Sequence, residues 1–235
     1  MKNLVSATVV ALSLIAGGSA HAVELVNNGT FTNLTNGVGQ IDAHTTAVGW
    51  TSNNYNFVFT NGNTTSPGGS VALWTASNGG SNTWNGLSAA GGNFLALDGD
   101  YNTGPVTQTI TGLTSGKTYE LTFDYAFGQQ KGYNGATIQS LAASVGSSKW
   151  DSGNVDVANH GFTGWQSEEF TFAATSSSEV LSFLATGNLP VPPFALVSNV
   201  SITAVPELST WAMMLAGFGG LGLAARLRRR RAVAA

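Results

Sequence analysis

Aromatic rings set among small polar residues are the feature of this sequence best suited to chemistry. A flat ring can lie against the face of a pyranose while amide or carboxylate groups reach the sugar hydroxyls. Stretches rich in Gly, Ser and Asn hold the candidate ligand-binding side chains Trp74, Trp84, Trp150 and Tyr101, with Tyr55 and Tyr133 in similar surroundings. The alternative for each ring is that it covers the edge of a core. Trp50 and Trp165 each follow Gly and adjoin strand patterns, so we assign both to the core.

Residues suited to catalysis are few. The chain has no Cys and no Gly-x-Ser-x-Gly turn, and His44 and His160 lack the spacing of metal ligands. A glycosidase needs two carboxylates at a defined separation, but the adjacent pair Glu168 and Glu169 would point to opposite faces of a strand. We therefore expect a protein that is not an enzyme and has no catalytic residues. A catalytic site assembled from loops is the alternative.

The segment between the two ends of the chain is acidic. From Val23 to Val205 it holds three lysines and no arginine against eleven acidic residues, a net charge of −8. Such a domain is repelled by phosphate backbones, which excludes nucleic acid as a partner. Because the chain has no Cys, no disulfide can stabilise it, and burial of a core must do so instead.

The elements that must position the rings have the patterns of short strands. In residues 119–127 aromatic and aliphatic side chains alternate strictly with Glu, Thr, Asp and Ala, which indicates an antiparallel strand with one buried face. Glycines at 112 and 116 separate it from residues 106–111, which predicts a β-hairpin. Further short runs of β-branched or aromatic residues lie at 94–97, 138–145, 169–173, 180–185 and 194–203. Repeated short strands without a convincing helix predict a single all-β sandwich.

Both ends of the chain carry targeting patterns. Residues 1–22 have an early Lys2, an apolar core and small residues up to Ala22, the layout of a secretory signal peptide. Residues 208–225 carry no charge and approach the length of a membrane-spanning helix. All five arginines follow this segment: Arg226, Arg228, Arg229, Arg230 and Arg231. Because Lys and Arg beside a membrane helix stay on the cytoplasmic side, we expect everything before Pro206 to lie outside the membrane.

The C-terminal segment 205–231 resembles the PEP-CTERM sorting signal of Gram-negative bacteria. Its motif at 205–208 has Val205, Pro206 and Glu207, with Leu208 in place of the usual second proline, ahead of the apolar segment and the arginine cluster at 226–231. The resemblance implies export through the inner membrane, transient anchoring, recognition by an exosortase, and transfer to the cell surface or the extracellular matrix. The alternative is a plain C-terminal anchor helix.

Residues 23–204 resemble the galactose-binding-like jelly rolls, related to carbohydrate-binding modules, that often precede such tails. The resemblance is carried by LVNNGTF at 25–31, FLALDGD at 94–100, VTQTITGLTSGKTYELTFDYA at 106–126 and PPFALVSNVSIT at 192–203. It implies a jelly-roll β-sandwich with carbohydrate as the ligand class. It also implies a structural calcium ion bound through oxygen atoms, to which Glu24, Asn28 and Asp124 would contribute, although Ser198 stands where relatives carry an acid. The Asp-Gly-Asp sequence at 98–100 is instead typical of a turn.

These patterns together predict an exported, exosortase-sorted protein of the cell envelope or extracellular matrix that is not an enzyme and binds or embeds in exopolysaccharide. Two alternatives stay open. One is a secreted carbohydrate-active enzyme with an unrecognised site in its loops, and the other is a purely structural surface protein without a ligand.

Overall fold

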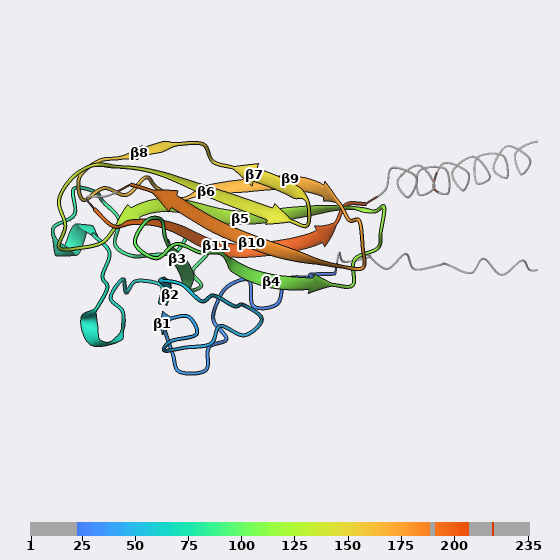
Figure 1. The fold of residues 1–235 in the computed structure, drawn as a ribbon, viewed down its shortest axis with the longest axis horizontal. Helices are drawn as coiled ribbons and strands as arrows, with labels where there is room; N and C mark the ends of the chain where they lie inside the picture. Colours follow the sequence, from blue (N-terminus) through green and yellow to red (C-terminus); the bar gives the residue numbers. More distant parts are fainter. Residues whose placement is uncertain (1–22, 189–190, 207–217, 219–235) are drawn as a thin grey trace, which may run out of the picture.

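Two antiparallel sheets face each other in the computed structural model, which describes residues 23–188, 191–206 and 218 (Figure 1). The six-stranded sheet has the order β1 (Gly39–Gln40), β2 (Asn56–Phe59), β3 (Phe94–Asp98), β11 (Pro193–Ala204), β5 (Thr118–Gln129) and β9 (Gln166–Ala173). The five-stranded sheet has the order β4 (Val106–Thr111), β10 (Ser178–Gly187), β6 (Thr137–Val145) and β7 (Ser148–Asp151), with β8 (Val155–Val157) also paired to β6. The described helices are two short 3-10 turns, η1 (Pro67–Gly69) and η2 (Ala76–Asn78). The predicted all-β sandwich is confirmed, and the arrangement is consistent with a jelly roll.

Several predicted targeting features fall outside the described residues. These are the signal peptide at 1–22, Glu207 of the sorting motif, the membrane helix at 208–225 apart from Phe218, and the arginine cluster at 226–231. Within the described ranges, no helix has the length and apolar character needed to cross a membrane. Val205 and Pro206 follow directly on β11.

Strand β5 supplies much of the core between the two sheets. Its alternate side chains point into this inner core, as the sequence predicts: Tyr119, Leu121, Phe123, Tyr125 and Phe127. In the same cluster they join side chains of the opposite sheet, among them Val106, Ile110, Leu141 and Phe183. Fully burying an aromatic or leucine side chain contributes about 1.5–3 kcal/mol, so this one strand makes a large contribution to folding.

The predicted β-hairpin between residues 106–111 and 119–127 is wrong. Strand β4 pairs with β10, whereas β5 pairs with β9 and β11, so the connection at 112–117 crosses from one sheet to the other. Gly112 and Gly116 permit the crossing with φ values of 84° and 83°, and Leu113 is buried between them. Each strand has one apolar row, and the two rows bury each other when they face across the sandwich.

The outer face of the six-stranded sheet carries a second apolar cluster. Here β2, β3, β5 and β11 direct Phe57, Phe59, Phe94, Ala96, Ala126, Phe194 and Leu196 away from the inner core. The long connection between β2 and β3, residues 60–93, covers them with Val71, Leu73 and Trp84. We call residues 60–93 the cover. Because of the cover, this part of the sheet is buried on both faces.

Trp84 is the central aromatic residue of the cover. Its ring stacks on Phe162 with a centroid distance of 4.3 Å and an interplanar angle of 8°, and only 6% of the residue is exposed. Its indole N–H donates a hydrogen bond of 2.7 Å to the carbonyl oxygen of Leu87. Trp84 also packs against Phe94 of β3, with ring centroids 5.8 Å apart, and thus fastens the cover to the sheet.

We expect Trp84→Ala to lower the free energy of unfolding by about 3–5 kcal/mol, because it leaves a cavity and removes a stacked ring. Urea unfolding followed by circular dichroism measures this loss. Tyr101→Ala is the control, since Tyr101 is 73% exposed and its removal should cost far less. Equal stabilities of the two variants would contradict the role assigned to Trp84.

Candidate functional site

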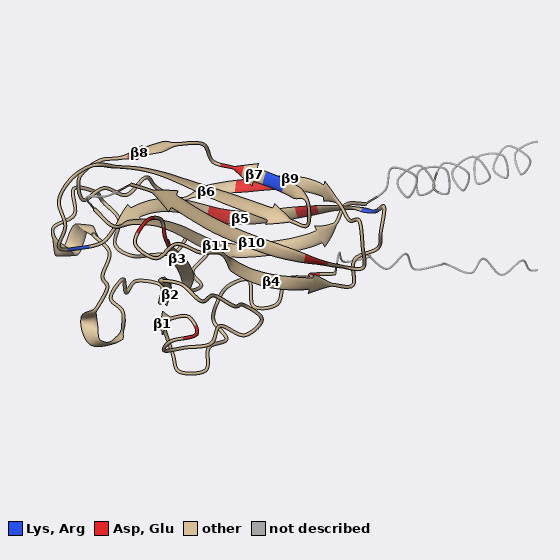
Figure 2. Cartoon of the chain, in the orientation of Figure 1, with Lys and Arg blue, Asp and Glu red and all other residues tan. Residues whose placement is uncertain are grey.

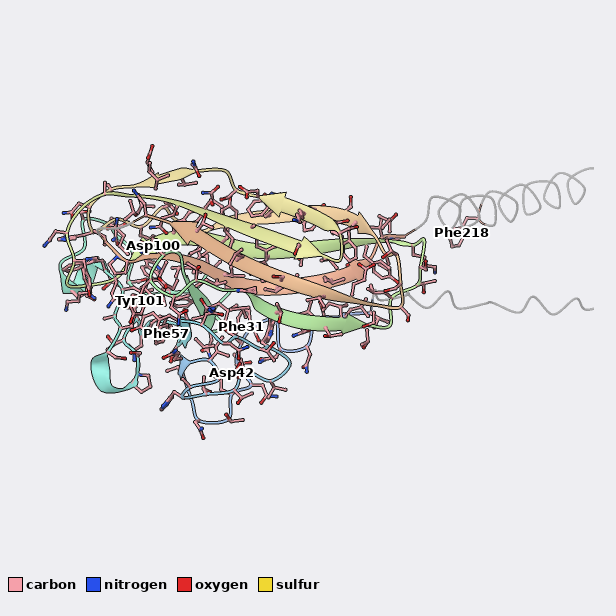
Figure 3. All side chains as sticks on the ribbon, viewed as in Figure 1. Phe31, Asp42, Phe57, Asp100, Tyr101 and Phe218 are labelled. Carbon is pink, nitrogen blue, oxygen red and sulfur yellow. The ribbon has the colours of Figure 1, made fainter. Side chains whose placement is uncertain are left out.

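Tyr55 and Tyr101 meet where β2 begins and β3 ends, on the outer face of the six-stranded sheet, and Tyr133 follows the end of β5. The rings of Tyr55 and Tyr101 lie 5.4 Å apart at an angle of 71°, and Tyr55 also meets Phe57 edge to face at 4.7 Å. Tyr133 lies in the loop after β5, and when ionised it repels the phenolate of Tyr55 and so raises the pKa of Tyr55. Tyr101 is 73% and Tyr133 45% exposed, and Figure 3 shows Tyr101 in the same region as Phe57. We call Tyr55, Tyr101 and Tyr133 the tyrosine face.

A buried carboxylate holds the turn that carries Tyr101. Asp98 ends β3 and is 1% exposed, and its carboxylate accepts hydrogen bonds from the backbone N–H groups of Asn102 and Asp100. The side-chain amide of Asn54 fixes the same turn from the other side, by donating to the side-chain oxygen of Asn102 and to the carbonyl of Thr103. The turn predicted from Asp-Gly-Asp is therefore present, and it fixes the backbone of Tyr101 relative to Tyr55.

Trp74 adjoins the tyrosine face through Tyr133. Its indole N–H donates to the carbonyl oxygen of Tyr133 at 3.3 Å, and its backbone N–H donates to the carbonyl oxygen of Gln129 at 3.0 Å. The indole ring stacks on His160 with centroids 4.0 Å apart, and Nε2 of His160 lies 2.8 Å from Oδ1 of Asn134. The cover, the loop after β5 and the loop after β8 thus meet at one half-buried tryptophan.

The chemistry of this region is that of neutral phenols above a buried acid. Burial raises the pKa of Tyr55, and repulsion from Tyr101, Asp98 and Tyr133 in their ionised forms raises it further, so its hydroxyl stays protonated at neutral pH. Burial also raises the pKa of Asp98, against hydrogen bonds from backbone N–H groups that lower it. The exposed groups are therefore rings with hydroxyl donors and acceptors.

The structure separates the four rings that the sequence offers as ligand-binding candidates. Tyr101 and Trp74 lie in the region of the tyrosine face, whereas Trp84 is buried under the cover. Trp150 lies elsewhere, half-buried on β7 against Phe123 and Tyr125. Trp50 is in the inner core as predicted, and Trp165 packs on the outer cluster beside Phe94.

The three residues that the resemblance implies as calcium ligands each form hydrogen bonds within the protein. The carboxylate of Glu24 accepts hydrogen bonds from the N–H groups of Val26 and Ile202 and from the hydroxyl of Ser201. The side chain of Asn28 bonds the backbone of residues 33 and 48, and Asp124 accepts from Ser167. Among the described residues, no three His, Cys, Asp or Glu side chains are grouped to hold a metal ion. Calcium binding stays a prediction.

Sequence reasoning missed Asn54 as a residue of the site and predicted Asp98 only as part of a turn. Asp98 is buried and Asn54 half-buried, and their role is to hold the turn at 98–103. The Asp-Gly-Asp turn pattern marks one of them, but the partnership of Asn54 with residues 48 and 49 positions later has no local signal.

Comparisons with known proteins give a family and distant structural likenesses. The family model described as "Protein of unknown function (DUF642)" matches residues 24–194. No curated protein matches the chain in sequence.

Among solved structures, an arabinose-bound α-L-arabinofuranosidase is 15% identical with a TM-score of 0.39, covering 80% of this chain and 27% of its own. TmCBM61 in complex with β-1,4-galactotriose is 13% identical with a TM-score of 0.39, covering 78% of this chain and 100% of its own. The CBM22-1 xylan-binding domain of Paenibacillus barcinonensis Xyn10C is 10% identical with a TM-score of 0.39, covering 79% and 97%. The chain thus spans about a quarter of the arabinofuranosidase. Likeness at this level does not identify a ligand.

The raised pKa of Asp98 predicts how its contribution to stability changes with pH. The folded state holds the proton more tightly than the unfolded state, where the pKa is near 3.8. The contribution is therefore full below that value and is lost as pH rises through the folded pKa. We expect the stability of the wild type relative to Asp98→Asn to fall as pH rises from 3 to 7, measured as the difference in urea midpoints. Asp100→Asn controls for loss of a charge from the same turn. A difference that grows with pH would overturn the assignment.

Proposed function

The chain belongs to the family described as "Protein of unknown function (DUF642)", and we propose that it is a non-enzymatic protein that binds polysaccharide across the tyrosine face and Trp74. The observation that carries this proposal is the exposure of Tyr101, whose ring meets that of Tyr55, and of Tyr133, whose carbonyl oxygen accepts a hydrogen bond from Trp74. Exposed rings that carry hydroxyl groups suit pyranoses, because the ring covers an apolar sugar face while the hydroxyl bonds its edge.

Preorganisation of the rings supports binding. The turn that carries Tyr101 is held by Asp98 and Asn54, and Trp74 is fixed by a stacked His160 and two hydrogen bonds. A site whose side chains are already ordered loses less conformational entropy when a ligand binds.

The charge of the domain favours a neutral polysaccharide. Residues 23–205 carry three lysines against eleven acidic residues, and Figure 2 shows the charged residues as short, scattered stretches of a ribbon formed mostly by uncharged residues. A uronic acid polymer would be repelled by the net charge of −8, whereas a neutral glycan would not.

The side chains near the tyrosine face favour binding over hydrolysis. A glycosidase needs two carboxyl groups that reach the scissile bond from either side. Asp98 is 1% exposed and is engaged by the backbone of its own turn, so its carboxylate does not face a ligand. This leaves Asp100, which is exposed and directly precedes Tyr101, as the acid nearest to that ring in the chain, whereas a glycosidase needs two such groups.

We further propose that the protein is exported, sorted by an exosortase and placed at the cell surface or in the extracellular matrix, with exopolysaccharide as its partner. The sorting motif and the arginine cluster support this proposal, as does the position of the described ends. The backbone N–H of Leu25 bonds Ile202 and that of Val205 bonds Thr118, so both ends leave beside the start of β5. Trp74 bonds Gln129 at the other end of this strand, about 36 Å away for twelve residues. A chain tethered through its C-terminus would therefore hold the tyrosine face away from the tether.

We expect Tyr101→Ala and Trp74→Ala each to weaken binding to a neutral polysaccharide about tenfold, or ~1.4 kcal/mol, because each removes a ring that the sugar covers. Affinity electrophoresis of the full-length protein in detergent against xylan, galactan and β-glucan measures the change. Ile138→Ala is the matched control, since Ile138 is 45% exposed on the other sheet. Binding that both aromatic variants retain in full would sink the assignment of this face.

Removal of residues 226–231 should leave an unprocessed precursor in the membrane, because the positive charge that holds the C-terminal segment is lost. Mass spectrometry of the protein recovered from cells reports the C-terminus directly. Replacement of the same arginines by lysine keeps the charge and should allow normal processing. An unchanged mature mass in the deletion strain would count against the sorting role.

A further inference from the structure

One lateral edge of the sandwich lies between β7 and β9. Strand β7 is the last strand of the five-stranded sheet on its path, β9 is the last of the six-stranded sheet, and the two lie side by side (Figure 1). Trp150 of β7 fills this edge. Its ring lies 5.2 Å from Phe123 at 80° and 5.1 Å from Tyr125 at 69°, and the residue is half-buried.

The indole N–H of Trp150 differs from those of the other described tryptophans. Trp50 and Trp74 donate to the carbonyl oxygens of Asn28 and Tyr133, and Trp84 and Trp165 both donate to that of Leu87. The N–H of Trp150 meets no acceptor among the residues that the structure describes. A tryptophan with its body in the core and its N–H without a protein partner can donate to a ligand.

The facing strand supplies polar groups beside this indole. Gln166 and Glu168 of β9 stand opposite Tyr125 and Phe123 in the strand register, on the side that faces Trp150. The hydroxyl of Tyr125 donates to Oε1 of Gln166 at 3.1 Å, which leaves the amide NH₂ of Gln166 available as a donor. Glu168 is half-buried and, with burial, raises the pKa of Tyr125. An aromatic ring, two N–H donors and a carboxylate acceptor therefore lie along one edge.

We propose that Trp150, Gln166 and Glu168 form a second glycan-binding site, separate from the tyrosine face. The carboxylate accepts from a sugar hydroxyl, the indole and the amide donate to hydroxyl or ring oxygens, and the indole supplies the apolar surface. This inference rests on the proposed function, from which it takes polysaccharide as the class of ligand. It adds that one molecule holds a polysaccharide at two points.

The two sites lie on different parts of the molecule. Tyr55 precedes β2 and the edge site ends at β9, four strand spacings away across the sheet, or about 19 Å. Trp74 bonds Gln129 at the end of β5, the strand beside β9. If two weak sites at this separation hold the same polysaccharide chain, the overall avidity can exceed the affinity of either site alone. The two sites can also join two polysaccharide chains.

The variants that test this proposal keep the packing of the edge. Trp150→Phe retains a ring against Phe123 and Tyr125 but removes the N–H donor, and Glu168→Gln keeps the shape but removes the acceptor charge. Glu169→Gln is the matched control, because its side chain points to the opposite face of the same strand. Circular dichroism and the urea midpoint confirm that each variant folds as the wild type does.

The experiment combines affinity with a probe at the tryptophan itself. Full-length protein in detergent is labelled with 5-fluorotryptophan, and the signal of Trp150 is identified by its absence in Trp150→Phe. We expect xylan, galactan or β-glucan, whichever binds, to shift this signal in the wild type and still to shift it in Tyr101→Ala. We also expect Trp150→Phe and Glu168→Gln to lower the affinity for the polymer about tenfold, and Tyr101→Ala/Trp150→Phe to abolish the binding that Tyr101→Ala retains.

Failure of this inference differs from failure of the proposed function. If Tyr101→Ala weakens binding while the Trp150 signal stays fixed and Trp150→Phe binds as the wild type does, the second site is overturned and the tyrosine face stands. If the wild type binds none of the three polysaccharides and no tryptophan signal moves, both proposals are overturned.

Discussion

The structure depends on an excess of apolar surface on one sheet. Strands β2, β3, β5 and β11 present apolar side chains on both faces, so the sandwich that buries the inner face leaves the outer one to be covered. The cover, residues 60–93, meets this need and cannot lie anywhere else without exposing Phe57, Phe59 and Phe94. Its course then brings Trp74 to Gln129 and Tyr133, which is how a requirement of packing places a ring at the candidate site.

The same packing requirement explains why the tryptophans occupy three environments. Trp50 and Trp84 are buried in the two cores, and the indole N–H of each donates a hydrogen bond to a backbone carbonyl. Trp74 lies between core and solvent, fixed at its N–H but half-exposed at its ring. Trp150 has the opposite arrangement, with its ring against the inner core and its N–H without a described partner. The two proposed sites use these two complementary arrangements.

The sequence was informative where a periodic signal reports burial. The alternation in residues 119–127 predicts the inner row of β5, and the alternative assigned to each loop ring, a lid over the core, describes Trp84. Partner choice was not predictable in the same way. The glycines at 112 and 116 suit a hairpin and a crossing equally well, and only the pairing of β4 with β10 separates the two. For the site, Trp74 and Tyr101 stood out by composition, but their approach to Tyr55 and Tyr133 depends on contacts between distant loops.

The position of β11 has a consequence for how the chain folds while it is being synthesised. The last strand of the domain lies between β3 and β5, so the six-stranded sheet lacks its middle until residues 193–204 have been synthesised. Pairing across such sequence distances is slow. If the chain is exported as proposed, the nascent polypeptide would until then have no complete sheet to resist passage through a narrow secretion channel.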